Sequence, residues 1–265
     1  MTANSGDTGA PPRVAIITGA GSGIGRACAL RFSRAGCAVV VSDVNEEGAQ
    51  DTHGRILQGG GESVCHVTDI TEEESCAALA QSALDRWGRI DILVANAGVQ
   101  LGGNLLDATR EEWETIMGVN SLGTAYSCRA VLPAMLEKRK GAMVITSSIN
   151  AVTGSPGMPI YDMSKAAVLA LMRSLAAEYG ARGIRVNAVC PGNTITDFHI
   201  NRMAEQGISE EQIREMTQGY ALLNRAAEPI EIANAIYFLA SEEASFITGQ
   251  ALCVDGGYSV TGGAD

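Results

Sequence analysis

Long apolar runs are missing from this 265-residue sequence, and no uncharged apolar stretch reaches the roughly 18 residues that would predict a transmembrane helix. Basic residues are scarce, because 19 Lys and Arg stand against 30 Asp and Glu, for a net charge of -11. Neutralising phosphates needs a basic face, so nucleic acid is not an expected partner, and neither is a membrane. Residues 1–12 lack a basic segment followed by an apolar one, which predicts a flexible N-terminal arm and no secretion signal.

Paired cysteine and histidine motifs are missing as well. The seven cysteines are odd in number, form no Cys-x-x-Cys pair and stand mostly in apolar runs. This pattern predicts reduced, buried thiols in a cytoplasmic protein. None of the three histidines has a second histidine at metal-ligand spacing, so no metal site is expected.

Short β-branched segments alternate with longer helical patterns along the chain. This alternation predicts an α/β fold, a Rossmann-like doubly wound parallel sheet of about seven strands with helices on both faces. Strands are expected at residues 14–18, 38–43, 63–67, 91–95, 143–146, 184–189 and 251–254. Helices are expected at about 23–35, 46–58, 109–138 and 161–179, and another should follow Thr71. No break in composition divides the series, so residues 13–265 are expected to form one domain.

Two pairs of residues predict capping boxes at helix N-termini. Thr71 and Glu74 form the first pair, and Thr109 and Glu112 form the second. In each pair the Thr side chain and the Glu side chain would satisfy backbone N–H groups of the first turn. The two helices are expected to begin at these residues.

A glycine-rich turn follows the first expected strand directly and reads Thr18-Gly19-Ala20-Gly21-Ser22-Gly23-Ile24-Gly25. Glycines let a backbone approach a diphosphate closely, and the N-terminus of the following helix offers free N–H groups and a positive dipole end. A plain strand-to-helix turn also uses glycine. The strand–turn–helix context nevertheless favours a dinucleotide site.

The second expected strand ends at Asp43, 18 residues after Gly25. A carboxylate at this place accepts hydrogen bonds from the adenosine ribose hydroxyls and repels a 2′-phosphate. Neither Ser22 nor Val44 is a cation that would bind such a phosphate. Asp43 therefore favours NAD over NADP, although it could also cap the following helix.

Further polar and glycine residues fall at the ends of expected strands. Open parallel sheets bind ligands beyond the carboxyl ends of their strands, so these residues should share one edge of the sheet. They are Asp69, which could accept a hydrogen bond from the adenine amino group, Asn96-Ala97-Gly98, Ser148 and Pro191-Gly192. Each alone is ordinary turn chemistry, but their common placement favours a ligand site.

Tyr161 and Lys165 stand four residues apart at the start of an expected helix, so their side chains share one face. A free tyrosine has a pKa of about 10, and a nearby ammonium group favours its phenolate. A surface Tyr/Lys pair is far more common than an active site. Ser148 shifts the interpretation towards catalysis, because its hydroxyl should lie at the same edge and could bind a substrate oxygen.

Asn120 lies on the apolar face that Trp113, Ile116 and Met117 mark on another expected helix. A buried amide must find hydrogen-bond partners. Asn120 is therefore either a polar bridge in the core or a residue that holds a water for proton transfer.

Together these motifs resemble those of the short-chain dehydrogenase/reductase family in its single-domain form. The matching positions span about residues 13–258 and are the glycine motif, Asp69, residues 96–98, Asn120, Ser148, Tyr161, Lys165, Pro191-Gly192, Thr196, residues 247–250 and residues 255–257. The combination is specific, although Tyr-x-x-x-Lys alone is not. Ala95, Asn150, Thr194 and Asn224 depart from the commoner residues, but none of these changes removes a catalytic group.

The resemblance implies an NAD-dependent oxidoreductase that interconverts a secondary alcohol and a ketone by hydride transfer. Ser148 would polarise the substrate oxygen and Tyr161 would take or give its proton. Lys165 would lower the tyrosine pKa and bind the nicotinamide ribose, and Asn120 would hold a water that passes the proton outward. The implied cofactor-binding residues are Gly19, Ser22, Gly23, Ile24, Gly25, Asp43, Val44, Asp69, Ile70, Asn96, Ala97, Gly98, Tyr161, Lys165, Pro191, Gly192, Thr194 and Thr196. The family commonly forms tetramers, so a homotetramer is expected.

The segment at about residues 193–225 is expected to form a lid over the substrate. Asp197, His199 and Arg202 suggest a polar or anionic small molecule such as a sugar, polyol or hydroxy acid, and Asn150 is expected to face it. Two other interpretations stay open. One is an NADPH-dependent 3-oxoacyl-type ketoreductase. The other is a non-catalytic nucleotide-binding protein, which need not keep Asn120 and the Ser-Tyr-Lys set together.

Overall fold

The computed structural model describes residues 11–261, so most of the expected N-terminal arm lies outside it. Its strands form one sheet in the order β3-β2-β1-β4-β5-β6-β7, and every neighbouring pair is parallel. The strands are β1 (Val14–Thr18), β2 (Ala38–Asp43), β3 (Ser63–Val67), β4 (Ile92–Ala95), β5 (Gly141–Thr146), β6 (Ile184–Pro191) and β7 (Ala251–Val254). This topology confirms the expected Rossmann-like fold, with its order reversing between β1 and β4.

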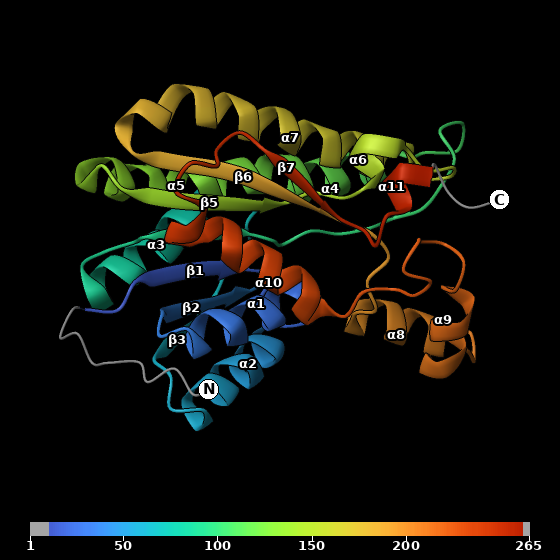
Figure 1. Ribbon diagram of the computed structural model, residues 1–265, viewed down its shortest axis with the longest axis horizontal. Helices are drawn as coiled ribbons and strands as arrows, with labels where there is room; N and C mark the ends of the chain where they lie inside the picture. The colour runs from blue at the N-terminus through green and yellow to red at the C-terminus, as the bar shows by residue number, and fades with distance from the viewer. Residues whose placement is uncertain (1–10, 262–265) are drawn as a thin grey trace.

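Helices cover both faces of the sheet (Figure 1). On one side lie α1 (Gly23–Arg34), α2 (Glu46–Gln58) and α10 (Pro229–Ala240), and on the other lie α3 (Glu73–Trp87), α5 (Thr124–Lys138) and α7 (Pro159–Tyr179). The shorter helices are α4 (Arg110–Met117), α6 (Asn150–Thr153), α8 (Asp197–Ala204), α9 (Glu210–Met216) and α11 (Tyr258–Thr261), with 3-10 turns at Gly180–Arg182 and Glu242–Ala244. None of the described helices is long and apolar enough to span a membrane.

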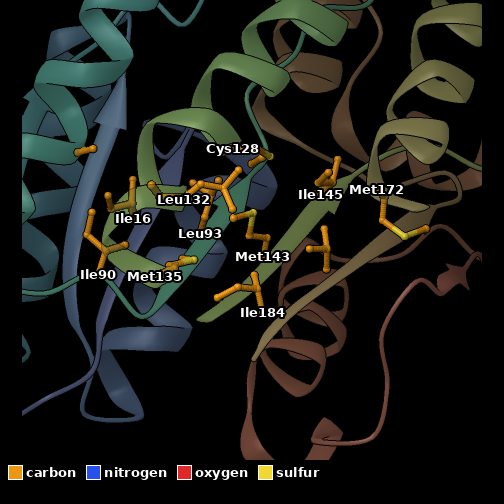
Figure 2. Close-up of a cluster of buried hydrophobic side chains, with 14 of the residues drawn as sticks. Ile16, Ile90, Leu93, Cys128, Leu132, Met135, Met143, Ile145, Met172 and Ile184 are labelled. Carbon is orange, nitrogen blue, oxygen red and sulfur yellow. The ribbon is translucent and has the colours of Figure 1, made fainter. Parts of the chain in front are cut away.

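Apolar side chains fill the space between the sheet and each helical layer. Ile16 of β1 and Leu93 of β4 belong to a buried cluster with Met135 of α5 and Met172 of α7 (Figure 2). The neighbouring strand residue Ile17 points to the opposite face and belongs to the cluster beneath α1 and α10. Because both faces are covered, the strands are continuous apolar runs and not alternating ones.

One of the two expected capping boxes is present, and it lies at α4. Thr109 accepts a hydrogen bond from the backbone N–H of Glu112, whose carboxylate accepts one from the Thr109 N–H. The expected box at Thr71 and Glu74 is wrong, since α3 begins at Glu73. Thr71 instead donates both its N–H and its hydroxyl to Asp69 Oδ1, a carboxylate only two residues away.

The expected helix over residues 109–138 is not one regular α-helix. After α4 the chain makes a π-helical turn at Gly118–Gly123 before α5 begins. Such turns are rare and often occur at functional sites. Asn120 lies within this turn. The 3.6-residue period of the apolar residues did not predict the turn, because it fits a regular α-helix.

The segment expected to be a lid contains α8 and α9, which lie together at one end of the sheet (Figure 1). Ile195, Ile213 and Ala226 form a small buried cluster of their own between them and the following chain. Thr194 and Ala227 pair as an isolated parallel bridge. The segment thus has its own small core beside the main ones.

Candidate active site

A cavity of about 550 Å³ opens at the carboxyl ends of the strands, where the sequence predicts a ligand site. Ser148, Asn150, Tyr161 and His199 line it. The expected cofactor-binding residues that also line it are Gly19, Ser22, Gly23, Ile24, Asp43, Val44, Asp69, Ile70, Asn96, Ala97, Gly98, Lys165, Pro191, Gly192, Thr194 and Thr196. Three expected site residues do not line it, and they are Gly25, Asn120 and Arg202.

Gly25 lies behind the glycine turn and lets α1 pack against it. A Cβ at this position would lie 1.9 Å from the carbonyl oxygen of Gly19 and 2.7 Å from Asn96 Nδ2. Gly19 has a φ of +66°, and a Cβ there would lie 2.8 Å from the Cα of Ala97. Gly25 therefore shapes the turn from behind the cavity wall and does not itself line the cavity.

Gly25→Ala is expected to lower the free energy of unfolding by about 1–3 kcal/mol, because the added methyl group overpacks the turn. It should also weaken dinucleotide binding, since Gly19 must move. Urea denaturation and NADH fluorescence titration measure the two effects. Gly54→Ala in α2 is the matched control, because a Cβ there meets nothing within 4 Å. Wild-type stability in Gly25→Ala would contradict the packing role.

Asp43 closes β2 beside the glycine turn. Its Oδ2 accepts a hydrogen bond from Gly21 N at 2.8 Å, and its Oδ1 accepts one from Asn45 N at 2.9 Å. Asn45, and not Asp43, is the N-cap of α2, because its side chain accepts a hydrogen bond from Gly48 N. The carboxylate is thus held at the place where this fold receives an adenosine ribose.

Asn96 ties the end of β4 to the glycine turn. Its Nδ2 donates to the carbonyl oxygens of Thr18 and Gly19, at 3.1 and 3.3 Å. In return, Thr18 Oγ1 accepts hydrogen bonds from the backbone N–H groups of Asn96 and Ala97. Thr18 belongs to the predicted glycine motif, but the sequence did not reveal that its hydroxyl holds the end of β4.

Tyr161, Ser148 and Lys165 meet in the cavity. Burial raises the pKa of Tyr161, and a hydrogen bond with the Ser148 hydroxyl acts in the opposite direction. Lys165 Nζ lies 5.8 Å from the centre of the Tyr161 ring and donates to the carbonyl oxygen of Thr146 at 3.1 Å. Burial lowers the pKa of Lys165 to about 8. The three groups that the sequence predicts for proton transfer therefore lie together.

Asn120 is buried in the π-helical turn, and its amide is hydrogen-bonded to protein groups. Oδ1 accepts from Val99 N at 2.8 Å, while Nδ2 donates to Val99 O and Ser164 Oγ, both at 2.9 Å. A Cβ on Gly98 would lie 3.1 Å from both Asn120 Oδ1 and Lys165 Nζ. The side chain thus forms a polar bridge that holds the chain after β4 against α7. Ser164 is a partner that the sequence did not reveal.

Ser148 is oriented by the backbone that follows it. Asn150 N donates to Ser148 Oγ at 3.2 Å, which leaves the serine proton available for another acceptor. The Asn150 side chain lines the cavity and donates to Asp162 Oδ1 at 2.9 Å. Asp162 was not anticipated, although a carboxylate beside Tyr161 in the first turn of a helix could have drawn attention to it.

The start of α8 contacts the glycine turn. Asp197 Oδ2 accepts a hydrogen bond from Gly23 N at 3.0 Å and lies 3.7 Å from a guanidinium nitrogen of Arg26. His199 Nδ1 and Thr196 Oγ1 are hydrogen-bonded at 2.8 Å. Arg202 is exposed, because it lies roughly one helical turn farther from the cavity than His199. Arg202, which was expected to contact a substrate, therefore does not line the cavity.

The cavity fits a polar ligand of dinucleotide size. Two buried hydroxyls on its wall, Ser42 Oγ and Thr146 Oγ1, have no hydrogen-bond partner within residues 11–261. Buried polar groups nearly always have one, so both hydroxyls are unsatisfied polar groups at the wall of the cavity. The glycine turn adds a cradle that a side chain at Gly19 would fill.

Comparisons with known proteins point to one family. The family described as enoyl-(acyl carrier protein) reductase matches residues 19–259. The short chain dehydrogenase/reductase astE of Aspergillus oryzae is 36% identical, over 98% of this chain and 100% of the relative. The meso-2,3-butanediol dehydrogenase of Serratia marcescens is 37% identical, over 95% and 96% of the two chains. The solved structure of levodione reductase superposes with a TM-score of 0.88 at 32% identity and covers 94% of this chain and 98% of its own.

Proposed function

This chain belongs to the short-chain dehydrogenase/reductase family, and we propose that it uses NAD(H) to interconvert a secondary alcohol and a ketone. The observation that carries this proposal is the meeting of Ser148, Tyr161 and Lys165 in one cavity that also reaches Asp43. The substrate would be a small polar alcohol, such as a sugar, polyol or hydroxy acid.

The cavity residues divide between the two halves of a dinucleotide. Gly19, Ser22, Gly23 and Ile24 would line the place of the diphosphate at the N-terminus of α1, and Asp43 would bind the adenosine ribose. Val44, Asp69 and Ile70 would surround the adenine, and residues 96–98, 191–192, Thr194 and Thr196 would hold the nicotinamide half. When bound, NAD⁺ supplies the acceptor for a hydride. The carboxylate of Asp43 supports NAD over NADP, because it would repel a 2′-phosphate.

The catalytic residues have separate tasks. Ser148 would donate its proton to the substrate oxygen, while its own oxygen accepts a hydrogen bond from Asn150 N. Tyr161 would take the alcohol proton as a phenolate, which the Lys165 ammonium would favour. Asn120 would pass that proton on through a water held near the π-helical turn. Its amide bonds to Val99 and Ser164 would keep this part of the cavity wall in place.

A cofactor titration combined with an oxidation assay tests the proposal. We expect NADH to bind more tightly than NADPH, and a panel of polyols, sugars, sterols and hydroxy acids to include a compound that reduces NAD⁺. Tryptophan fluorescence measures the binding and NADH absorbance measures the turnover. Tighter binding of NADPH would overturn the role of Asp43, and binding without any turnover would support a non-catalytic protein.

An NADPH-dependent ketoreductase acting on acyl carriers is the second candidate. The description of the matching family, which names an acyl carrier protein, favours it. The same titration separates the two, because this candidate requires NADPH and a 3-oxoacyl thioester.

We further propose that the chain assembles as a homotetramer. Apolar residues on and beside the edge strand β7, including Phe246, Leu252 and Val260, are exposed in the single chain. A sheet edge of this kind is suited to pairing with a second copy.

All seven cysteines are free thiols, which agrees with the reducing cytoplasm expected for the protein.

A further inference from the structure

The carboxylate of Asp162 faces the amide of Asn150 at the substrate end of the cavity. Asp162 Oδ1 accepts a hydrogen bond from Asn150 Nδ2 at 2.9 Å, and its Oδ2 accepts one from Ser155 N at 2.7 Å. Asp162 stands directly after Tyr161 in the first turn of α7, whereas Asn150 begins α6. The pair therefore joins the two segments that carry Ser148 and Tyr161.

This contact decides which way the Asn150 amide points. An ionised carboxylate only accepts hydrogen bonds, so the NH₂ group of the amide must face it. The Asn150 Oδ1 atom is then left as an acceptor, and no described group donates to it. Gln100, which also lines the cavity, likewise directs its Nε2 to a protein atom, Met158 Sδ at 3.4 Å. This end of the cavity thus offers acceptors to a ligand.

Asn150 also lies close to the reacting atoms. Its backbone N–H donates to Ser148 Oγ, the atom proposed to bind the reacting oxygen of the substrate. An acceptor on the side chain of the same residue is placed to meet a group only a short way along the substrate from that oxygen.

The charges around the cavity disfavour an anion. Among its described lining residues only Lys165 and His199 are basic. Lys165 is bound to Thr146 O, and burial lowers the pKa of His199, which favours its neutral form. Arg202 is exposed outside the cavity, whereas Asp162 contributes a negative charge beside Tyr161. A carboxylate or phosphate on the substrate would therefore lack a cation.

We propose that Asn150 and Asp162 form a subsite that accepts a hydrogen bond from a hydroxyl on the carbon next to the reacting one. Asn150 touches this hydroxyl, and Asp162 is a positioning residue that fixes the amide. The substrate class is then neutral vicinal diols, with the matching α-hydroxy ketones as products. This inference rests on the proposed dehydrogenase function.

Matched pairs of alcohols test the inference with the full-length enzyme and NAD⁺. The pairs are 2,3-butanediol with 2-butanol and cyclohexane-1,2-diol with cyclohexanol, and 3-hydroxybutyrate serves as the anionic compound. We expect kcat/KM for each diol to exceed that of its monoalcohol about tenfold or more, which is the worth of one good hydrogen bond. The anion should be the poorest substrate.

Asp162→Asn and Asn150→Ala are both expected to reduce the diol-to-monoalcohol ratio about tenfold, and the double variant should lose no more than either single one. Glu178→Gln, which removes an exposed carboxylate from the same helix, should keep the ratio of the wild type. NADH binding and thermal midpoints establish that each variant folds. Asn150→Ala provides the second test if Asp162→Asn fails to fold.

Each other outcome has a definite meaning. A wild-type enzyme that oxidises diol and monoalcohol equally, or that prefers the anion, would leave the proposed function standing and overturn the subsite. An unchanged ratio in both variants would do the same. If the wild type bound NADH but oxidised none of these alcohols and no compound of the wider panel of polyols, sugars, sterols and hydroxy acids, the proposed function would fail and the subsite with it.

Discussion

Tyr161→Phe should retain NADH affinity and lose about 10³-fold in kcat, within the range by which general acid–base catalysis accelerates reactions. The substitution removes one oxygen atom and keeps the ring, so the cavity wall keeps its shape. Without the phenol, no group remains beside Ser148 to take the alcohol proton. Stopped-flow absorbance at saturating NAD⁺ measures the chemical step, and fluorescence titration measures NADH binding.

Tyr179→Phe is the matched control, because it makes the same change at the other end of the same helix. We expect it to behave as the wild type. In the wild type the oxidation rate should rise with pH, since the phenolate is the active form and burial raises the pKa of Tyr161. A Tyr161→Phe enzyme that keeps full turnover, or a wild-type rate that stays flat with pH while chemistry limits it, would remove Tyr161 as the base.

Lys165→Met should lower kcat about 10²-fold or more, because the phenolate of Tyr161 loses the ammonium beside it.

Lys165→Met should also stabilise the fold. Burial lowers the pKa of Lys165 from 10.5 to about 8, so the folded protein binds this proton less well than the unfolded chain does. At pH 7 this costs roughly 3 kcal/mol of stability, and losing the bond to Thr146 O offsets about 1 kcal/mol of the gain. A net gain of about 2 kcal/mol is expected.

The pH dependence of that gain follows from the sign of the shift. Wild-type stability should rise between about pH 8 and pH 10.5, the interval in which the unfolded chain holds the Lys165 proton and the folded protein does not. The advantage of Lys165→Met should therefore be largest near pH 7 and disappear towards pH 10.5. Urea denaturation at several pH values measures it. A variant less stable than the wild type at pH 7 would show that Lys165 is held without a desolvation penalty.

Sequence patterns predicted the sheet well because buried parallel strands are short, apolar and separated by clear helical periods. They also placed Asp43, Ser148 and Tyr161, since the carboxyl ends of parallel strands meet at one edge whatever the packing of the helices. What the patterns could not supply was local competition for hydrogen bonds. Thr71 had an acidic partner on either side, and only the structure shows that Asp69 takes both donors.

Contacts between segments that are distant in the sequence were also not predicted. Asp162 and Ser164 stand beside Tyr161 and Lys165 in the sequence, but their partners come from other helical segments. These partners are Asn150 and Asn120. No periodicity reports such a meeting. Arg202 was expected at the site because it is close in sequence to His199. It does not line the cavity, because the rise of α8 carries it away.

The π-helical turn at residues 118–123 joins α4 to α5 and is wider than an α-helical turn. A π-helical turn closes through i→i+5 bonds and so holds one residue more than an α-helical turn. Deleting a single residue there would restore regular α-helical winding with nearly the same rotation between α4 and α5, but it would displace the residues of the turn itself. The Asn120 amide would then swing off Val99 and Ser164. Chain length in this stretch is consequently under tighter constraint than residue identity, so insertions and deletions that surface loops absorb readily should be rejected here.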